Sequence, residues 1–149
     1  QAFIPGRIEP IPYQNKLILL DGAHNPDSFK ALVETIQERF PGKKFQILFG
    51  SLKNKLVQEN VEICSAIVRK IWWTKIPGHD SALRESVFLQ PEILVSIEFS
   101  SPDEALKRMI QEASDGEMLI VTGSLYLAGS IRKLLLPDTA INYRLVKED

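Results

Sequence analysis

The sequence predicts a three-layer, Rossmann-like α/β domain with a mainly parallel sheet flanked by helices. Short apolar runs recur along the chain, at residues 17–20, 45–49, 71–74, 94–99 and 118–121. Stretches of helical periodicity alternate with these runs, and glycine- or proline-containing turns separate many of them. Strands that alternate with helices form β-α-β units, so the strands should be parallel and covered on both faces.

The first helix is expected over residues 27–40. Its apolar positions recur at steps of three and four residues, which is one stripe of an amphipathic helix. Pro26 suits the first helical turn, and Pro41-Gly42 should end the helix. The stripe consists of Phe29, Leu32, Val33, Ile36 and Phe40.

Three further helices are expected, over residues 56–70, 102–113 and 125–136. Ser101 is a candidate cap for the second of these, since serine often accepts the first free N–H groups of a helix. Residues 76–93 are weakly patterned, with a short helix expected near residues 82–87. Residues 141–146 alternate between apolar and polar side chains, as is typical of an edge strand.

Composition limits the classes of partner. The chain has 149 residues, the size of one domain, and its 18 basic residues nearly balance 19 acidic ones. Such a balance gives no long-range field toward nucleic acid or a membrane surface. The sequence also has no apolar run long enough to span a bilayer. We therefore expect neither nucleic acid nor a membrane as a partner, and the single cysteine fits a reducing, cytoplasmic setting.

Cysteine and histidine usage argues against a disulfide framework and a metal site. Cys64 is the one cysteine, and it lies on an expected buried helix face, where a thiol usually serves packing. The two histidines, His24 and His79, show no metal-ligand spacing.

Three turns are expected to share one edge of the sheet. They lie at residues 21–25, 50–51 and 122–124, each between an apolar strand and a helix. The carboxyl ends of parallel strands meet at one edge, and open α/β sheets bind their ligands there. Helix N-termini at that edge also favour anions such as phosphate or carboxylate.

The polar residues near these turns have alternative interpretations. Asp21 suits ribose hydroxyls, and His24 can donate or accept a hydrogen bond. Asn25 and Ser124 can equally cap the helices that follow them. Arg7 is either a solvated surface residue or a phosphate clamp.

Specific motifs accompany these turns. They are Pro-Gly-Arg-Ile-Glu at residues 5–9, Leu-Leu-Asp-Gly-Ala-His-Asn-Pro at 19–26, and Thr-Gly-Ser-Leu-Tyr-Leu-Ala-Gly at 122–129. With the strand and helix pattern between them, the whole chain resembles the carboxy-terminal half of folylpolyglutamate synthases. This family belongs to the Mur ligases and is often bifunctional with dihydrofolate synthase in bacteria.

The resemblance implies an ATP-dependent ligase that adds L-glutamate to a folate, or to dihydropteroate, through an acyl phosphate. It implies that Arg7 contacts ATP phosphate and Asp21 the ribose. It further implies that His24 and Ser124 line the glutamate pocket and orient the amine. ATP and Mg²⁺ are the implied cofactors.

The sequence differs from that family in two respects. The sequence contains no G-x-x-x-x-G-K-[ST] phosphate loop. In the turn after Gly50, Asn54 and Leu56 stand where relatives often have acids. We therefore expect residues 1–149 to be a single carboxy-terminal glutamate ligase domain, without the amino-terminal ATP-binding domain. The metal ligands should lie on that domain, and the isolated chain should be inactive.

Two rival functions remain open at this stage. The first is a hydrolase, because Asp21, His24 and Ser124 are triad residue types; however, Ser124 is not in a G-x-S-x-G elbow. The second is a free-standing nucleotide-binding or interaction module without catalysis, which the missing phosphate loop favours if the chain is complete.

Overall fold

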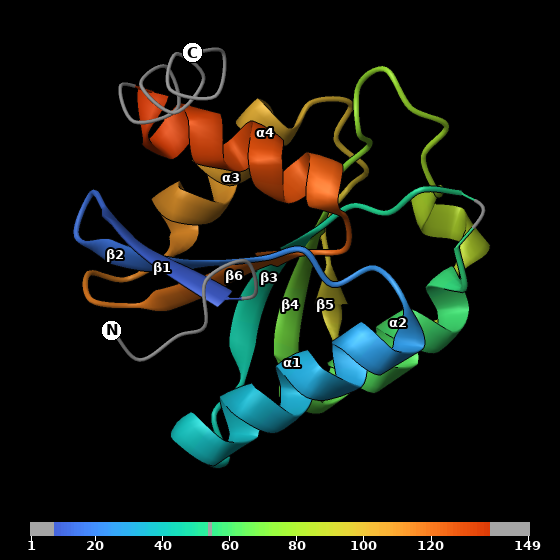
Figure 1. Ribbon diagram of the computed structural model, residues 1–149, viewed down its shortest axis with the longest axis horizontal. Coiled ribbons are helices and arrows are strands. Elements are labelled where there is room, and N and C mark those ends of the chain that lie inside the picture. Colours follow the sequence, from blue (N-terminus) through green and yellow to red (C-terminus); the bar gives the residue numbers. More distant parts are fainter. Residues whose placement is uncertain (1–7, 54, 138–149) are drawn as a thin grey trace, which may run out of the picture.

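The computed structural model describes residues 8–53 and 55–137, and they form one six-stranded sheet between two layers of helices (Figure 1). The strand order is β1-β2-β6-β3-β4-β5, and every neighbouring pair is parallel except β1 with β2. The three-layer α/β prediction is confirmed. The alternating run at residues 141–146 lies outside the described residues. The strands are β1 (Ile8–Tyr13), β2 (Lys16–Asp21), β3 (Phe45–Phe49), β4 (Val68–Trp73), β5 (Leu94–Val95) and β6 (Met118–Thr122).

The helices divide between the two faces of the sheet. α1 (Pro26–Arg39) and α2 (Val57–Cys64) cover one face, while α3 (Pro102–Glu112) and α4 (Leu125–Leu135) cover the other (Figure 1). Alternate side chains of each central strand enter the two cores: Ile47 and Phe49 pack with α1 and α2, whereas Leu48 packs with α3 and α4. Because helices bury both faces of the sheet, the central strands are continuous apolar runs in the sequence.

β1 is a strand that the hydrophobic pattern did not indicate. Pro10 and Pro12 interrupt it, and proline is tolerated only where no ladder hydrogen bond is needed, as on an edge strand. A two-residue turn joins β1 to β2, with Gln14 at φ 49° and Asn15 at φ 64°. Positive φ at both positions gives the twist that a tight hairpin needs.

The predicted helix over residues 56–70 was wrong at its C-terminal end. α2 stops at Cys64, a 3-10 turn follows at Ser65–Ile67, and β4 begins at Val68. The charged residues at this end of the predicted helix are Arg69 and Lys70. In the structure they lie near the start of a strand, where they form ion pairs with Glu117 and Glu112.

The strand expected over residues 94–99 was also wrong in length. β5 holds only Leu94–Val95. The Ser96 hydroxyl accepts the hydrogen bond from the Trp73 N–H in place of a backbone carbonyl, and this interrupts the hydrogen-bond ladder between β4 and β5. Phe99 rejoins the sheet as a single bridge to Thr74. The short helix near residues 82–87 is a 3-10 turn at Arg84–Ser86. Ser101 occupies the N-cap of α3 without making a side-chain cap bond.

Candidate functional site

The three predicted turns do lie at one edge. β2, β6 and β3 are adjacent and parallel, so Asp21, Thr122 and Phe49 end side by side. The chain leaves β2 for α1 on one face and leaves β6 for α4 on the other (Figure 1). A crevice outside the strand ends is expected where neighbouring connections diverge in this way.

Backbone contacts fix the three turns against one another. The N–H of Gly123 donates to the Ala23 carbonyl over 3.1 Å, and that of Gly50 donates to the Thr122 carbonyl over 3.4 Å. Gly123 has φ +117°, and a Cβ atom there would fall on the Gly50 carbonyl oxygen. Only glycine lets the turns approach this closely.

Asp21 is buried at the end of β2, with 7% of its surface exposed. Its Oδ2 accepts the Ala23 N–H over 2.8 Å and the Thr122 hydroxyl over 3.4 Å. These bonds fix the orientation of the carboxylate and give Asp21 a structural role in shaping the turn. Thr122, as its partner, is a site residue that the sequence motif contained but that was assigned no role.

His24 is half-buried and held at three atoms. Its ring Nδ1 lies 2.9 Å from the Gly22 carbonyl, which can only accept, so Nδ1 carries the proton and Nε2 of the neutral ring is the acceptor. Its backbone N–H donates to the Ser28 hydroxyl over 3.0 Å. Its carbonyl accepts from the Asn60 side chain over 3.3 Å.

Asn25 and Ser124 both cap helices. The Asn25 side chain accepts the Ser28 N–H over 2.8 Å in a capping box at the start of α1. The buried Ser124 hydroxyl accepts the N–H groups of Tyr126 and Leu127 at the start of α4. Its own hydrogen is still available to a ligand, because these bonds use only its acceptor capacity.

The contacts of His24 and Ser124 do not assemble a hydrolase triad. In a triad, Nδ1 of the histidine faces a carboxylate and the serine hydroxyl faces its other nitrogen. Here Nδ1 of His24 faces a backbone carbonyl, and the Ser124 hydroxyl faces the backbone of α4. The geometry therefore disfavours the hydrolase interpretation.

Cys64 is buried, as the sequence predicted. Burial, and to a lesser degree the negative charge of Asp21, raise its pKa to about 12. A thiol with so high a pKa is not a nucleophile at neutral pH, so Cys64 serves packing.

A second histidine lies near the same edge. His79 stacks on Tyr126, in the first turn of α4, with ring centroids 4.1 Å apart. His79 had been assigned no role, and no sequence signal joins it to a residue 47 positions later. Arg7, the predicted phosphate contact, lies outside the described residues.

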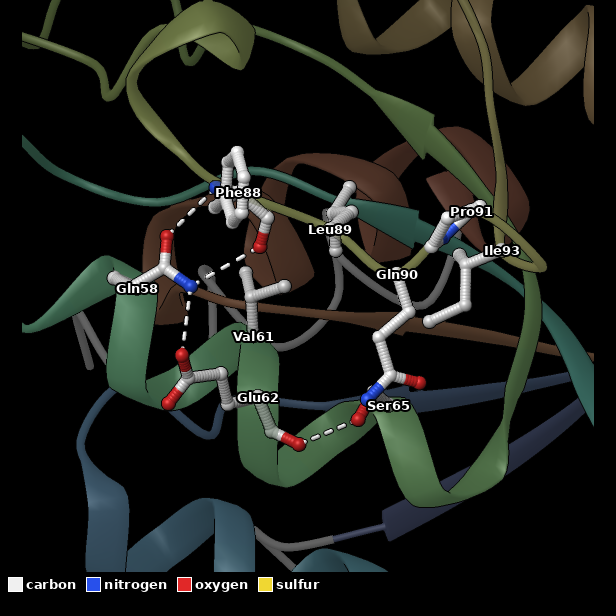
Figure 2. A pocket seen from close by; sticks show the side chains of 9 residues that line it. All are labelled: Gln58, Val61, Glu62, Ser65, Phe88, Leu89, Gln90, Pro91 and Ile93. Atoms are coloured by element: carbon white, nitrogen blue, oxygen red, sulfur yellow. Dashed lines mark hydrogen bonds between the residues drawn. The ribbon is translucent and has the colours of Figure 1, made fainter.

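A pocket of about 450 Å³ lies elsewhere, between α2 and the segment at residues 88–93 (Figure 2). Several of its polar groups bond to one another. Gln58 contacts both backbone groups of Phe88 and the Glu62 carboxylate, while Ser65 donates to the Glu62 carbonyl. None of the pocket's lining residues comes from the three turns, so it is separate from the candidate site.

The fold and this edge define a class: an α/β domain in which three polar, glycine-containing turns meet at the carboxyl ends of its parallel strands. Residues 6–125 match the family model "Mur ligase, glutamate ligase domain". The chain belongs to this family.

Relatives and solved structures agree with that assignment. The chain is 29% identical over 135 residues to a dihydrofolate synthase/folylpolyglutamate synthase of Bacillus subtilis, covering 91% of this chain and 31% of the relative. It is 31% identical over 133 residues to a folylpolyglutamate synthase of Lacticaseibacillus casei, covering 89% and 30%. A bifunctional Yersinia pestis enzyme complexed with AMPPNP and Mn superposes with TM-score 0.73 at 23% identity, covering 89% and 32%. The chain thus spans less than a third of the length of these relatives.

Proposed function

We propose that this chain is the glutamate-binding domain of an ATP-dependent ligase that adds L-glutamate to a folate or a dihydropteroate. The observation that carries the proposal is the meeting of Asp21, His24 and Ser124 at one sheet edge, in a chain of the glutamate ligase family. The reaction joins the glutamate nitrogen to a substrate carboxyl carbon while ATP is split to ADP and phosphate.

His24 and Ser124 are proposed to bind glutamate. Because His24 Nδ1 is committed to Gly22, the Nε2 lone pair can accept a hydrogen bond from the glutamate amine. Ser124 still has a hydroxyl hydrogen for a carboxylate. Such fixed groups orient the amine before attack, which lowers the entropic cost of the transition state.

Asp21 is proposed to contact the ribose of ATP, and Arg7 its phosphates. With Oδ2 of Asp21 held by Ala23 and Thr122, a ribose hydroxyl would meet a carboxylate of fixed orientation. Over residues 8–53 and 55–137, no group of three or more metal-ligating side chains could hold an ion. Mg²⁺ is proposed to bind an amino-terminal ATP-binding domain, as the resemblance to folylpolyglutamate synthases implies.

Exposed apolar side chains support a partner domain at this edge. Leu56 precedes α2 and is 60% exposed, while Leu125 and Tyr126 begin α4 and are 61% and 56% exposed. Contiguous exposed apolar groups are typical of an interface, and Leu125 and Tyr126 are adjacent at the start of α4. Within the described residues no helix is long and apolar enough to cross a membrane. A cytoplasmic setting is part of the proposal.

The decisive experiment compares this chain with the full-length ligase that carries an amino-terminal ATP-binding domain. With ATP, Mg²⁺, a folate and glutamate, the full-length enzyme should form ADP and a glutamylated product, and this chain alone should form neither. Failure of the full-length enzyme to add glutamate would overturn the proposal.

Nucleotide affinity tests the rival module. Two polar anchors contribute roughly 1–3 kcal/mol each, and the loss of translational and rotational freedom offsets part of this, so this chain should bind ATP no tighter than about millimolar. A micromolar dissociation constant by calorimetry would favour the free-standing nucleotide-binding module instead.

A further inference from the structure

Asn60 is a buried polar residue on α2 that no motif marks. It has no exposed surface, and it shares the buried face of α2 with Val57, Val61 and Cys64. Its Oδ1 is the one buried side-chain nitrogen or oxygen atom without a hydrogen-bond partner in residues 8–53 and 55–137. A buried acceptor left unpaired costs free energy, so its presence needs an explanation other than stability.

The other end of the same amide supplies that explanation. Nδ2 of Asn60 donates to the carbonyl of His24 over 3.3 Å, linking α2 to the turn after β2. The opposite amide orientation would set two carbonyl oxygens against each other, so the contact itself determines which way the amide faces. Leucine or valine would fill this position without an unpaired oxygen, but neither could hold the turn.

The bond completes the restraint of His24. Ser28 in the first turn of α1 holds its N–H and Gly22 holds its ring Nδ1, both from within four residues in sequence. Asn60 lies 36 residues away in sequence and holds the carbonyl from a neighbouring helix. Asn60 therefore fixes the position of His24 relative to the core that packs under α2. The bonds to Ser28 and Gly22 cannot do this, because these residues lie close to His24 in sequence.

We propose that Asn60 is a positioning residue, which fixes the His24 backbone and thereby presents the imidazole Nε2 to glutamate. The inference rests on the proposed function, since it takes glutamate as the ligand of His24. Asn60 itself does not touch the substrate, because its polar atoms are buried.

The first test needs no activity. In this chain, long-range ¹H–¹⁵N spectra above the usual titration range of histidine should show His24 protonated at Nδ1. Asn60→Leu removes only the bond to the His24 carbonyl, so it should shift the ring Nε2 and backbone amide signals of His24 while Nδ1 keeps its proton. Val61→Ala, the adjacent buried position on α2, should leave both signals in place. An Asn60→Leu spectrum with unchanged Nε2 and amide signals of His24 would overturn the inference and leave the proposed function intact.

The second test uses the full-length ligase. Asn60→Leu should raise the KM for glutamate about three- to tenfold, the value of one neutral hydrogen bond, with the KM for ATP unchanged. Val61→Ala should leave the ratio of the two constants unchanged. Equal increases in both constants, or the same glutamate effect in Val61→Ala, would overturn the inference. Asn60→Ala serves the same comparison if leucine prevents folding. A wild-type enzyme that adds no glutamate overturns the proposed function, and the role of Asn60 toward glutamate with it.

Discussion

Gly123 donates its backbone N–H to the carbonyl oxygen of Ala23 across 3.1 Å, and so joins the turn after β6 to the turn after β2. These two turns come from segments about a hundred residues apart, and they carry Ser124 on one side and Asp21 and His24 on the other. Backbone contacts therefore help to set their mutual position, together with the Thr122 to Asp21 side-chain bond.

Gly123→Ala should lower the free energy of unfolding by about 2–4 kcal/mol, because φ +117° strains an alanine and its Cβ would strike the Gly50 carbonyl. Gly129→Ala is the matched control. Gly129 lies inside α4 with open space around it, so alanine there should stabilise by about 0.5–1 kcal/mol. Urea unfolding of both variants measures the difference. A Gly123→Ala protein as stable as the wild type would contradict the close approach of the turns.

Ser124→Ala should cost about 0.5–2 kcal/mol of stability, since it removes a side-chain cap from α4. Ser101→Ala is the control, because Ser101 holds the same position on α3 without a side-chain cap bond and should lose only a few tenths. Thermal or urea unfolding compares the two serines. In the full-length ligase, Ser124→Ala should also raise the glutamate KM. If stability falls but that KM is unchanged, Ser124 is a cap alone.

His24→Ala in the full-length ligase should raise the glutamate KM roughly ten- to a hundredfold and barely change the ATP KM. Only the substrate that made the lost bond senses its removal. Asp21→Ala should show the reverse, with a larger effect on ATP. Both constants and the melting temperature should be measured on each variant. If His24→Ala lowers the melting temperature but leaves the glutamate KM unchanged, His24 has a structural role and does not bind glutamate.

The lowered pKa of Glu117 should make the free energy of unfolding depend on pH. Partial burial raises its pKa, but hydrogen bonds from the Ser114 N–H, Gln46 and Arg69, together with the Arg69 charge, lower it below the ordinary 4.5. A pKa lower in the folded state means that the stabilisation is complete above the ordinary value and is lost as pH falls through the folded value.

Glu117→Gln should therefore be less stable than the wild type at about pH 7, and the difference should shrink toward about pH 3. Urea unfolding at several pH values measures it. Glu112→Gln, which removes a half-exposed pair with Lys70, is the control and should change stability little. A Glu117→Gln deficit that stays constant with pH would contradict the assignment.

Local patterns predicted much of the fold and part of the site. The stripe Phe29, Leu32, Val33 and Ile36 is the buried face of α1, and Asn25 caps that helix. Errors arose where tertiary contacts override local propensity. Lys70 lies in a strand because β3 and β5 pair on either side of it, and Ser96 breaks a strand because its hydroxyl replaces a ladder acceptor.

The sequence by itself determined the class of the domain, since apolar runs of strand length and helical stripes encode which faces must be buried. It also determined where the motif turns lie, because glycine and capping residues affect the backbone conformation of residues adjacent to them in sequence. Only the tertiary structure decided that Thr122 meets Asp21, that Asn60 holds His24 and that His79 stacks on Tyr126. Strand order sets these contacts, and strand order follows from packing both cores at once, which no local pattern specifies.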